Sequence, residues 1–401
     1  MKKCNYKISI LSVFLFLSLF TMAQTSKLAD VVDAFSADSR ALKSMYTMNE
    51  SEEYYKRLLS FYENWNKKIE DILFEELSQQ EKVDYSLLKN LIAKNSYFLS
   101  LEYSSFQKVA SVTDLAKKIY PFIVERRRGK KPNSKNLAFE MYTASEAIEH
   151  RIEKLKSNKF KDWLTAEKAS QVVFSLQNAL AEAYQFYDSY DPDFTWWVEK
   201  PYEDLSEKLK TYGAFLKANY TTNSIKDDGS GIVGKPIGRD AIIKNLAYEY
   251  IPYSPEELIQ AAEDQFEWCK DEMIKASKEL GYDTDWKAAL EHVKNTYVPA
   301  GEQPQTITNL YDQSVAFIEE RDLITLPELA KETWGMIMMT PERQKVNPFF
   351  TGGWEISISY PTQSMNLDDK LMSMRGNNPN FSRATVQHEL LPGHNLQFFM
   401  N

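Results

Sequence analysis

The segment that decides the fold of this chain is residues 380–401, which read NFSRATVQHELLPGHNLQFFMN. Its centre, residues 388–394 (HELLPGH), places two imidazoles and one carboxylate within seven residues, in a chain that has four histidines altogether. Imidazole nitrogen is a preferred zinc ligand, and a carboxylate beside a zinc-bound water can act as its general base. This concentration predicts a metal centre of the hydrolytic type.

The spacing of the two histidines predicts a break in the helix that carries them. In the motif H-E-x-x-H the histidines lie four residues apart and share one helical face. Here they lie six residues apart, so a straight helix would separate them by roughly 120°. Pro392 removes an amide donor and disfavours helical angles at Leu391, and Gly393 is the most permissive residue. We therefore expect a helix broken or bulged at Pro392, with His394 turned back toward His388.

A second interpretation of the same residues is an ordinary helix end followed by a turn. His388 and His394 would then be polar residues near a terminus. Average usages of about 5% for proline and 7% for glycine make H-E-x-x-P-G-H roughly 300-fold rarer than bare H-E-x-x-H. This rarity favours the metal centre.

The pattern H-E-x-x-P-G-H, which continues as Asn395-Leu396-Gln397, resembles the bacterial domain-of-unknown-function 885 family, regarded as zinc-metallopeptidase-like. Upstream likeness is found at residues 353–355, 360–361, 370–378 and 381–384, and more weakly at 190–192, 196–197 and 237–240. The resemblance covers most of the chain and is most specific over its last fifty residues.

This resemblance implies roles for three residues. His388 and His394 would bind Zn²⁺, and Glu389 would be the catalytic base of a peptidase. Zinc would lower the pKa of a bound water toward about 7, Glu389 would take the proton, and the hydroxide would attack the substrate carbonyl. Tyr360 and Arg375 are candidate oxyanion donors by sequence proximity.

The resemblance also implies a third metal ligand, a glutamate some tens of residues beyond the second histidine. The sequence stops seven residues after His394. We therefore expect a C-terminally truncated family member, and we expect the chain as given to bind zinc partially or not at all.

The first 23 residues predict export. They have three lysines near the start, an apolar run over residues 8–20 and a small residue, Ala23, at the end. This is typical of a secretory signal peptide cleaved between Ala23 and Gln24, and the apolar run is short for a membrane span. We expect a secreted or periplasmic protein with no stable membrane span after cleavage; the alternative is an uncleaved anchor.

Charge and cysteine content narrow the partners and the source of stability. The formal net charge is −9, and the signal peptide contains three of the lysines, so the mature protein is more acidic still. We therefore expect no nucleic-acid partner. The basic cluster at residues 126–131 is interpreted as a solvated loop, and the glycines at residues 227–231 lack the context of a phosphate site. Only Cys269 remains after cleavage, so no internal disulfide is possible.

The chain reads as mainly α: a multi-helix protein with a short β element next to a zincin-like metal helix, in two lobes around a cleft. After the signal peptide we expect an N-terminal helical region over residues 24–250 and a zincin-like catalytic region over residues 251–401, incomplete at its C-terminus. Apolar residues at helical spacing predict helices over about 27–110, 113–125, 138–155, 164–187, 205–220, 239–250, 255–280 and 306–320.

Three segments carry more specific expectations. The aromatic stripe at residues 54–65 is assigned to the core rather than to a ligand groove. Residues 188–201 predict a turn-rich break in which Trp196 and Trp197 anchor a loop onto the core. Residues 352–360 alternate as in a half-buried strand, and residues 354–360 are the candidate substrate strand by resemblance to zincins; the alternative is an ordinary buried strand.

These features together predict an exported zinc hydrolase, most simply a metallopeptidase acting on a peptide or small protein. Two alternatives stay open. One is a non-catalytic secreted helical protein that binds peptide or glycan, and the other is a zinc hydrolase of non-peptide amides or esters.

Overall fold

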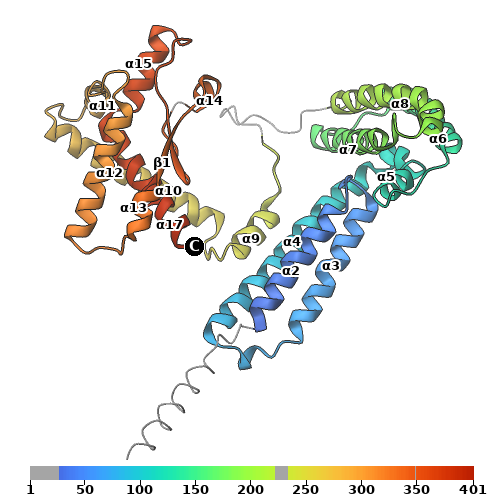
Figure 1. The fold of residues 1–401 in the computed structure, drawn as a ribbon, viewed down its shortest axis with the longest axis horizontal. Helices are drawn as coiled ribbons and strands as arrows, with labels where there is room; N and C mark the ends of the chain where they lie inside the picture. Colours follow the sequence, from blue (N-terminus) through green and yellow to red (C-terminus); the bar gives the residue numbers. More distant parts are fainter. Residues whose placement is uncertain (1–26, 222–233, 348) are drawn as a thin grey trace, which may run out of the picture. The chain divides into compact units, whose positions relative to one another are not determined.

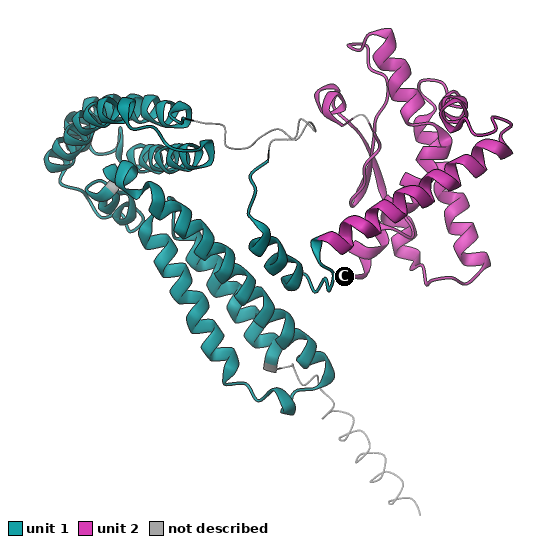
Figure 2. Ribbon diagram, turned by 180° about the vertical axis from the view of Figure 1, so that it is seen from behind, with its two compact units in different colours: residues 1–255 teal, residues 256–401 magenta. Residues whose placement is uncertain are grey.

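The computed structural model describes residues 27–221, 234–347 and 349–401. The predicted signal peptide, its cleavage point and the glycine-rich stretch at residues 227–231 lie outside these residues. The described chain is built of α-helices with one two-stranded sheet, so the predicted mainly α fold is confirmed. It divides into two compact units, Met1–Pro255 and Glu256–Asn401 (Figure 2). The sequence places the corresponding boundary at residue 250.

The first unit is a set of long helices (Figure 1). In it, α4 packs against α2, α3, α7 and α9, and α8 packs against α6 and α7. The helices are α2 (Lys27–Ser44), α3 (Glu52–Glu70), α4 (Gln79–Thr113), α5 (Tyr120–Arg126), α6 (Ser134–Ser157), α7 (Trp163–Tyr187), α8 (Pro192–Ala218) and α9 (Arg239–Tyr248).

Helix α3 shows why these segments fold as they do. Its N-cap, Ser51, accepts a hydrogen bond from the backbone N–H of Tyr54, which satisfies one otherwise unpaired donor. Its buried residues, at helical spacing, are Tyr55, Leu58, Phe61, Tyr62, Trp65 and Ile69. The aromatic stripe therefore belongs to the core, as predicted.

The predicted break is confirmed for residues 188–191 and wrong for residues 192–201, because α8 runs through them. The Asp191 side chain accepts the N–H groups of Asp193 and Phe194, and Pro192 occupies a position where a missing N–H costs nothing. Buried Phe194 and other apolar residues at helical spacing then hold the helix despite Pro201 in its interior.

The expected role of the tryptophan pair in α8 is wrong as well. Trp196 is 83% exposed, and Trp197 is also exposed. The inward face of the helix is taken by Phe194 and Val198, which are fully buried, so helical spacing turns Trp196 toward solvent.

The second unit consists of shorter helices and the sheet. The helices are α10 (Pro255–Glu279), α11 (Trp286–Lys294), α12 (Gln303–Glu320), α13 (Glu328–Thr333), α14 (Pro341–Val346), α15 (Leu367–Gly376), α16 (Pro379–Glu389) and α17 (His394–Met400). Strand β1 (Gly335–Met338) pairs in parallel with β2 (Glu355–Ile358), with Gly335 opposite Glu355. The predicted stop of α10 is confirmed, since Gly281 follows it with φ of 81°.

The strand predicted at residues 352–360 exists, but it is not half-buried. Ile356, Ser357, Ile358 and Ser359 are all buried. One edge of β2 pairs with β1, and on the other side Ser357 exchanges two backbone hydrogen bonds with Thr351, of 2.6 and 3.2 Å. At Ser357 the candidate substrate strand therefore has no free edge.

The core of the second unit lies between α12, the sheet and the paired helices α16 and α17. Its buried residues are Ile307, Leu310, Tyr311, Ala330, Phe350, Ile356, Ile358, Val386, Leu390, Leu391 and Leu396. Among the described residues, no helix combines the length and the apolar character needed to cross a bilayer.

Candidate metal centre

Helix α16 carries the first half of the predicted site. Asn378 caps it by accepting the N–H groups of Asn380 at 3.1 Å and Phe381 at 3.2 Å, and Pro379 occupies its first turn. The helix ends at Glu389, because Leu390 has φ of −103° and ψ of −111°, and a new helix begins at His394. The predicted break at this place is present, with a cis peptide bond between Leu391 and Pro392.

The joint between α16 and α17, residues 390–393, is held by the core. Leu390 and Leu391 are fully buried, and Leu396 follows them into the same core from α17. The hydroxyl of Ser314 on α12 donates a buried hydrogen bond of 2.9 Å to the carbonyl of Leu391. Packing and this hydrogen bond together fix the angle at which the second histidine returns toward the first.

Two glycines allow the close contacts around the joint. A Cβ atom at Gly393 would overlap the carbonyl oxygen of His388, so a side chain there would push the two helices apart. A Cβ atom at Gly352 would overlap the side chain of Glu389. Sequence reasoning missed the role of Gly352, because the contact joins residues far apart in the chain; the only local signal was the adjacent pair of glycines.

The three predicted site residues come together at this joint. The rings of His388 and His394 have centroids 4.7 Å apart and are nearly perpendicular, at 86°. One ligand atom from each of His388, Glu389 and His394 lies within 4.8 Å of the other two. His388 is exposed, whereas Glu389 and His394 are partly buried.

The donor set fits a zinc ion. Two imidazole nitrogens are ordinary zinc donors, and the Glu389 carboxylate lies beside them, where it can act as a base rather than as a ligand. Nδ1 of His394 lies 3.4 Å from the Gln397 side-chain oxygen, which accepts its hydrogen and leaves the Nε2 lone pair for a metal. The ligand atoms of the cluster lie within 4.8 Å of one another, whereas two ligand atoms of a tetrahedral zinc are roughly 3.4 Å apart. Because His388 is exposed, its side chain has the freedom to turn toward an ion and shorten these distances. Within the described residues, Glu389 is the one acidic member of this cluster.

Comparison with known protein families and solved structures shows which proteins this chain is similar to. The family described as "Bacterial protein of unknown function (DUF885)" matches residues 44–401. The chain belongs to this family. A solved structure described as "a putative lipoprotein of unknown function from Shewanella oneidensis" matches this chain with a TM-score of 0.57 and 15% identity. The match covers 94% of this chain and 72% of the solved one. At this identity the likeness shows the fold alone. The comparison with curated proteins gives no match.

The contacts of the other candidate residues lie away from the histidine cluster, and at Tyr360 the contact is made by the backbone. Arg375 forms an ion pair with Glu291, and Lys294 together with Arg375 lowers the pKa of the Glu291 carboxyl. The backbone N–H of Tyr360 donates to the Gln344 side chain at 3.1 Å. His292 is exposed and its ring contacts Tyr282. None of these contacts joins the histidine cluster.

Aromatic side chains lie directly beside the cluster. The ring of Phe398 is nearly parallel to that of His394, with centroids 5.9 Å apart, and the ring of Trp354 lies 5.6 Å from that of Phe398. The side-chain amide of Asn395 donates to the Trp354 carbonyl at 2.9 Å. The residues that lead into β2 therefore run alongside the histidine cluster.

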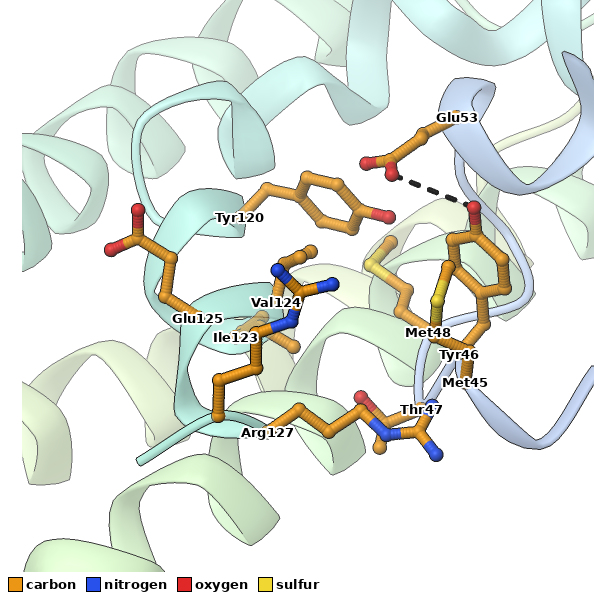
Figure 3. A pocket seen from close by; sticks show the side chains of 11 residues that line it. Met45, Tyr46, Thr47, Met48, Glu53, Tyr120, Ile123, Val124, Glu125 and Arg127 are labelled. Atoms are coloured by element: carbon orange, nitrogen blue, oxygen red, sulfur yellow. Dashed lines mark hydrogen bonds between the residues drawn. The ribbon is translucent and has the colours of Figure 1, made fainter. Parts of the chain in front are cut away.

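The first unit of this protein has a pocket of its own, of about 360 Å³ (Figure 3). It lies between the α2–α3 connection and α5, and Arg127 and Arg128 of the predicted basic loop line it. Tyr46 donates a hydrogen bond of 3.5 Å to Glu53 across it. Burial, opposed by a hydrogen bond with Ser51 and reinforced by Glu53, raises the pKa of Tyr120 to about 12. A hydroxyl with this pKa stays neutral at physiological pH, so the pocket offers aromatic and charged contacts without a ready nucleophile.

Proposed function

We propose that this protein is an exported zinc-dependent hydrolase, and specifically a metallopeptidase. The observation that carries the proposal is the approach of His388, Glu389 and His394 to within 4.8 Å of one another across a helix break. Two glycines admit the close packing of these residues. Such clusters of ligating side chains at fixed positions are the basis of metal-assisted hydrolysis.

In this proposal each residue has one task. His388 and His394 would hold a zinc ion from two different helices. When bound, zinc supplies Lewis acidity that activates a water for attack on an amide carbonyl. A carboxylate oxygen of Glu389 takes a proton from that water as the new C–O bond forms, and delivers it to the amide nitrogen as the C–N bond breaks. Gly352 keeps Glu389 in place by leaving room for its side chain.

Export is part of the proposal. It rests on the predicted signal peptide of residues 1–23, and the description of the similar solved structure as a lipoprotein agrees with a location outside the cytoplasm. The expected site of action is the periplasm or the exterior, where peptides are the most accessible substrates of this chemistry.

The test uses Glu389→Gln and His394→Ala, with exposed His292→Ala as the matched control. Zinc content is measured by elemental analysis and hydrolysis with a mixture of peptides. We expect Glu389→Gln to keep its zinc and lose at least about 100-fold in turnover, and His394→Ala to lose zinc. The control should behave as the natural protein.

Three outcomes would redirect the proposal. Unchanged turnover in Glu389→Gln removes the role of the base, and full zinc retention by His394→Ala supports the turn interpretation. Peptides that bind but are never cut, without effect of a chelator, favour the binding protein. Cleavage confined to esters or non-peptide amides favours the third possibility.

A further inference from the structure

Helix α17 has two faces with opposite character. Leu396 and Asn395 are buried, with Leu396 in the core of the second unit. His394 and Phe398, four residues apart, share the other face, so whatever binds at His394 lies next to the Phe398 ring. This outer face is continued by Trp354, whose ring contacts Phe398. We call Trp354 and Phe398 the aromatic platform.

The aromatic platform is fixed with respect to the histidine cluster. On one side of Trp354, Gly352 abuts the Glu389 side chain. On the other, the Trp354 carbonyl accepts a hydrogen bond of 2.9 Å from Asn395, which is itself buried. Since Phe398 and His394 belong to one helix, both members of the platform are tied to the site residues through short, rigid connections. A side chain resting on the platform is therefore held at a set place relative to Glu389.

Both side chains of the aromatic platform are exposed to solvent. Trp354 is 63% exposed and Phe398 is 40% exposed, although the Trp354 carbonyl is bound by buried Asn395 and Phe398 shares its helix with buried Leu396. Contiguous exposed apolar surface beside convergent polar groups is the usual composition of a small-molecule or peptide subsite. Aromatic rings gain the most from covering another large apolar group, because each buries 150–250 Å² of its own surface on full burial.

From this placement we propose that the aromatic platform is the subsite for a substrate side chain, and that it selects peptides with an aromatic or large aliphatic residue beside the cleaved bond. The proposal rests on the hydrolase function proposed above and names its substrate class. The platform itself carries no charge, so apolar contact sets the preference. A cationic side chain stacked on Trp354 is the competing occupant, because cations also bind over indole.

The experiment uses the natural protein and a series of peptides that differ at one position, with Phe, Leu, Ala or Lys. The variants are Trp354→Ala, Trp354→Phe and, as the control, Trp196→Ala, which removes an exposed tryptophan from α8. We expect the natural protein to prefer Phe and Leu over Ala and Lys in kcat/KM. Trp354→Ala should lower the Phe-to-Ala ratio roughly tenfold or more, Trp354→Phe should restore most of it, and Trp196→Ala should leave it unchanged.

A second measurement separates this inference from the proposed function. The same peptides are titrated into Glu389→Gln by calorimetry, with and without Trp354→Ala, and zinc content is checked in each. The Phe-to-Ala ratio of affinities should fall with Trp354→Ala while zinc is retained. If the natural protein cuts no peptide, the hydrolase function fails, and the binding ratio still decides the platform. A ratio that Trp354→Ala leaves unchanged, or a preference for Lys peptides, overturns the aromatic subsite.

Discussion

The two units of this protein achieve their packing in different ways. The first buries a large core rich in aromatic rings on helices of up to 35 residues, such as α4. The second has a smaller, mostly aliphatic core in which Tyr311 and Phe350 are the buried aromatic residues among those described. Its sheet strands have four residues each, and α13 and α14 have six.

This difference shows where each unit gets its stability. A 35-residue helix with a capping box at Ser78 and Glu81 has strong local determinants. Helices of six or seven residues are unstable alone, so those around the histidine cluster depend on tertiary packing. The candidate site therefore lies in the unit whose short helices keep their geometry through packing against one another.

The comparison predicts that alkaline pH unfolds the first unit before the second. In the first unit burial raises the pKa of Tyr46, Tyr54, Tyr55, Tyr62, Tyr120, Tyr184, Tyr187 and Tyr212. In the second, Tyr311, with a pKa of about 12, is the one described tyrosine so affected. The pKa of such a tyrosine is higher in the folded protein than in the unfolded chain, where it is about 10. Its contribution to stability is therefore complete below about pH 10 and is lost as the pH rises through about 12.

The loss of stability adds over several tyrosines, so alkaline unfolding of the first unit is the largest effect that we expect. The measurement is brief proteolysis at each pH from 9 to 12 with an alkali-tolerant protease, followed by mass mapping of the fragments. Tyr212→Phe, which removes a fully buried hydroxyl with a pKa of about 12, should reduce the sensitivity of the first unit. Cleavage that begins in the second unit would contradict the prediction.

A matched pair of leucines tests whether the site depends on the second core. Leu209 in α8 and Leu391 at the joint are both fully buried. Each change to alanine should cost about 2–5 kcal/mol in the free energy of unfolding, measured with urea. Leu391→Ala should also weaken zinc binding, because it loosens the joint between the two histidines, whereas Leu209→Ala should not. Equal zinc affinities in the two variants would separate the site from its core.

A smaller effect is expected for the hydrogen bond at the joint. Ser314→Ala leaves the buried Leu391 carbonyl without its partner, which should cost about 1–3 kcal/mol in urea denaturation. The control is Ser145→Ala in α6, where the buried hydroxyl has no hydrogen-bond partner among the described residues. That change should be neutral or stabilising. A similar cost for both serines would show that the hydrogen bond contributes nothing specific.

The sequence predicted the features that depend on residues close to one another in the chain. The break at Pro392, the return of His394 toward His388 and the buried stripe of α3 all follow from local backbone rules or helical spacing. The start of α8 was predicted too late in the chain, because the cap at Asp191 and the buried Phe194 already hold a helix in the segment expected to be turn-rich.

Features set by distant residues could not be predicted. Strand β1 has no strong signal of its own and forms through its pairing with β2. Buried Ser357 was expected on an exposed face because the contact with Thr351 is invisible in the alternation of the strand. In the candidate site, the contact of Gly352 with Glu389 spans 37 positions, and no periodicity encodes it.

The joint at residues 390–393 has a consequence for how such a site can evolve. On one continuous helix the spacing of the ligands is fixed by backbone geometry. Here the two histidines stand on separate helices whose angle is set by Leu390, Leu391 and Ser314. If the proposed zinc site holds, substitutions in the core would therefore tune its metal affinity by small steps while every ligand stays the same.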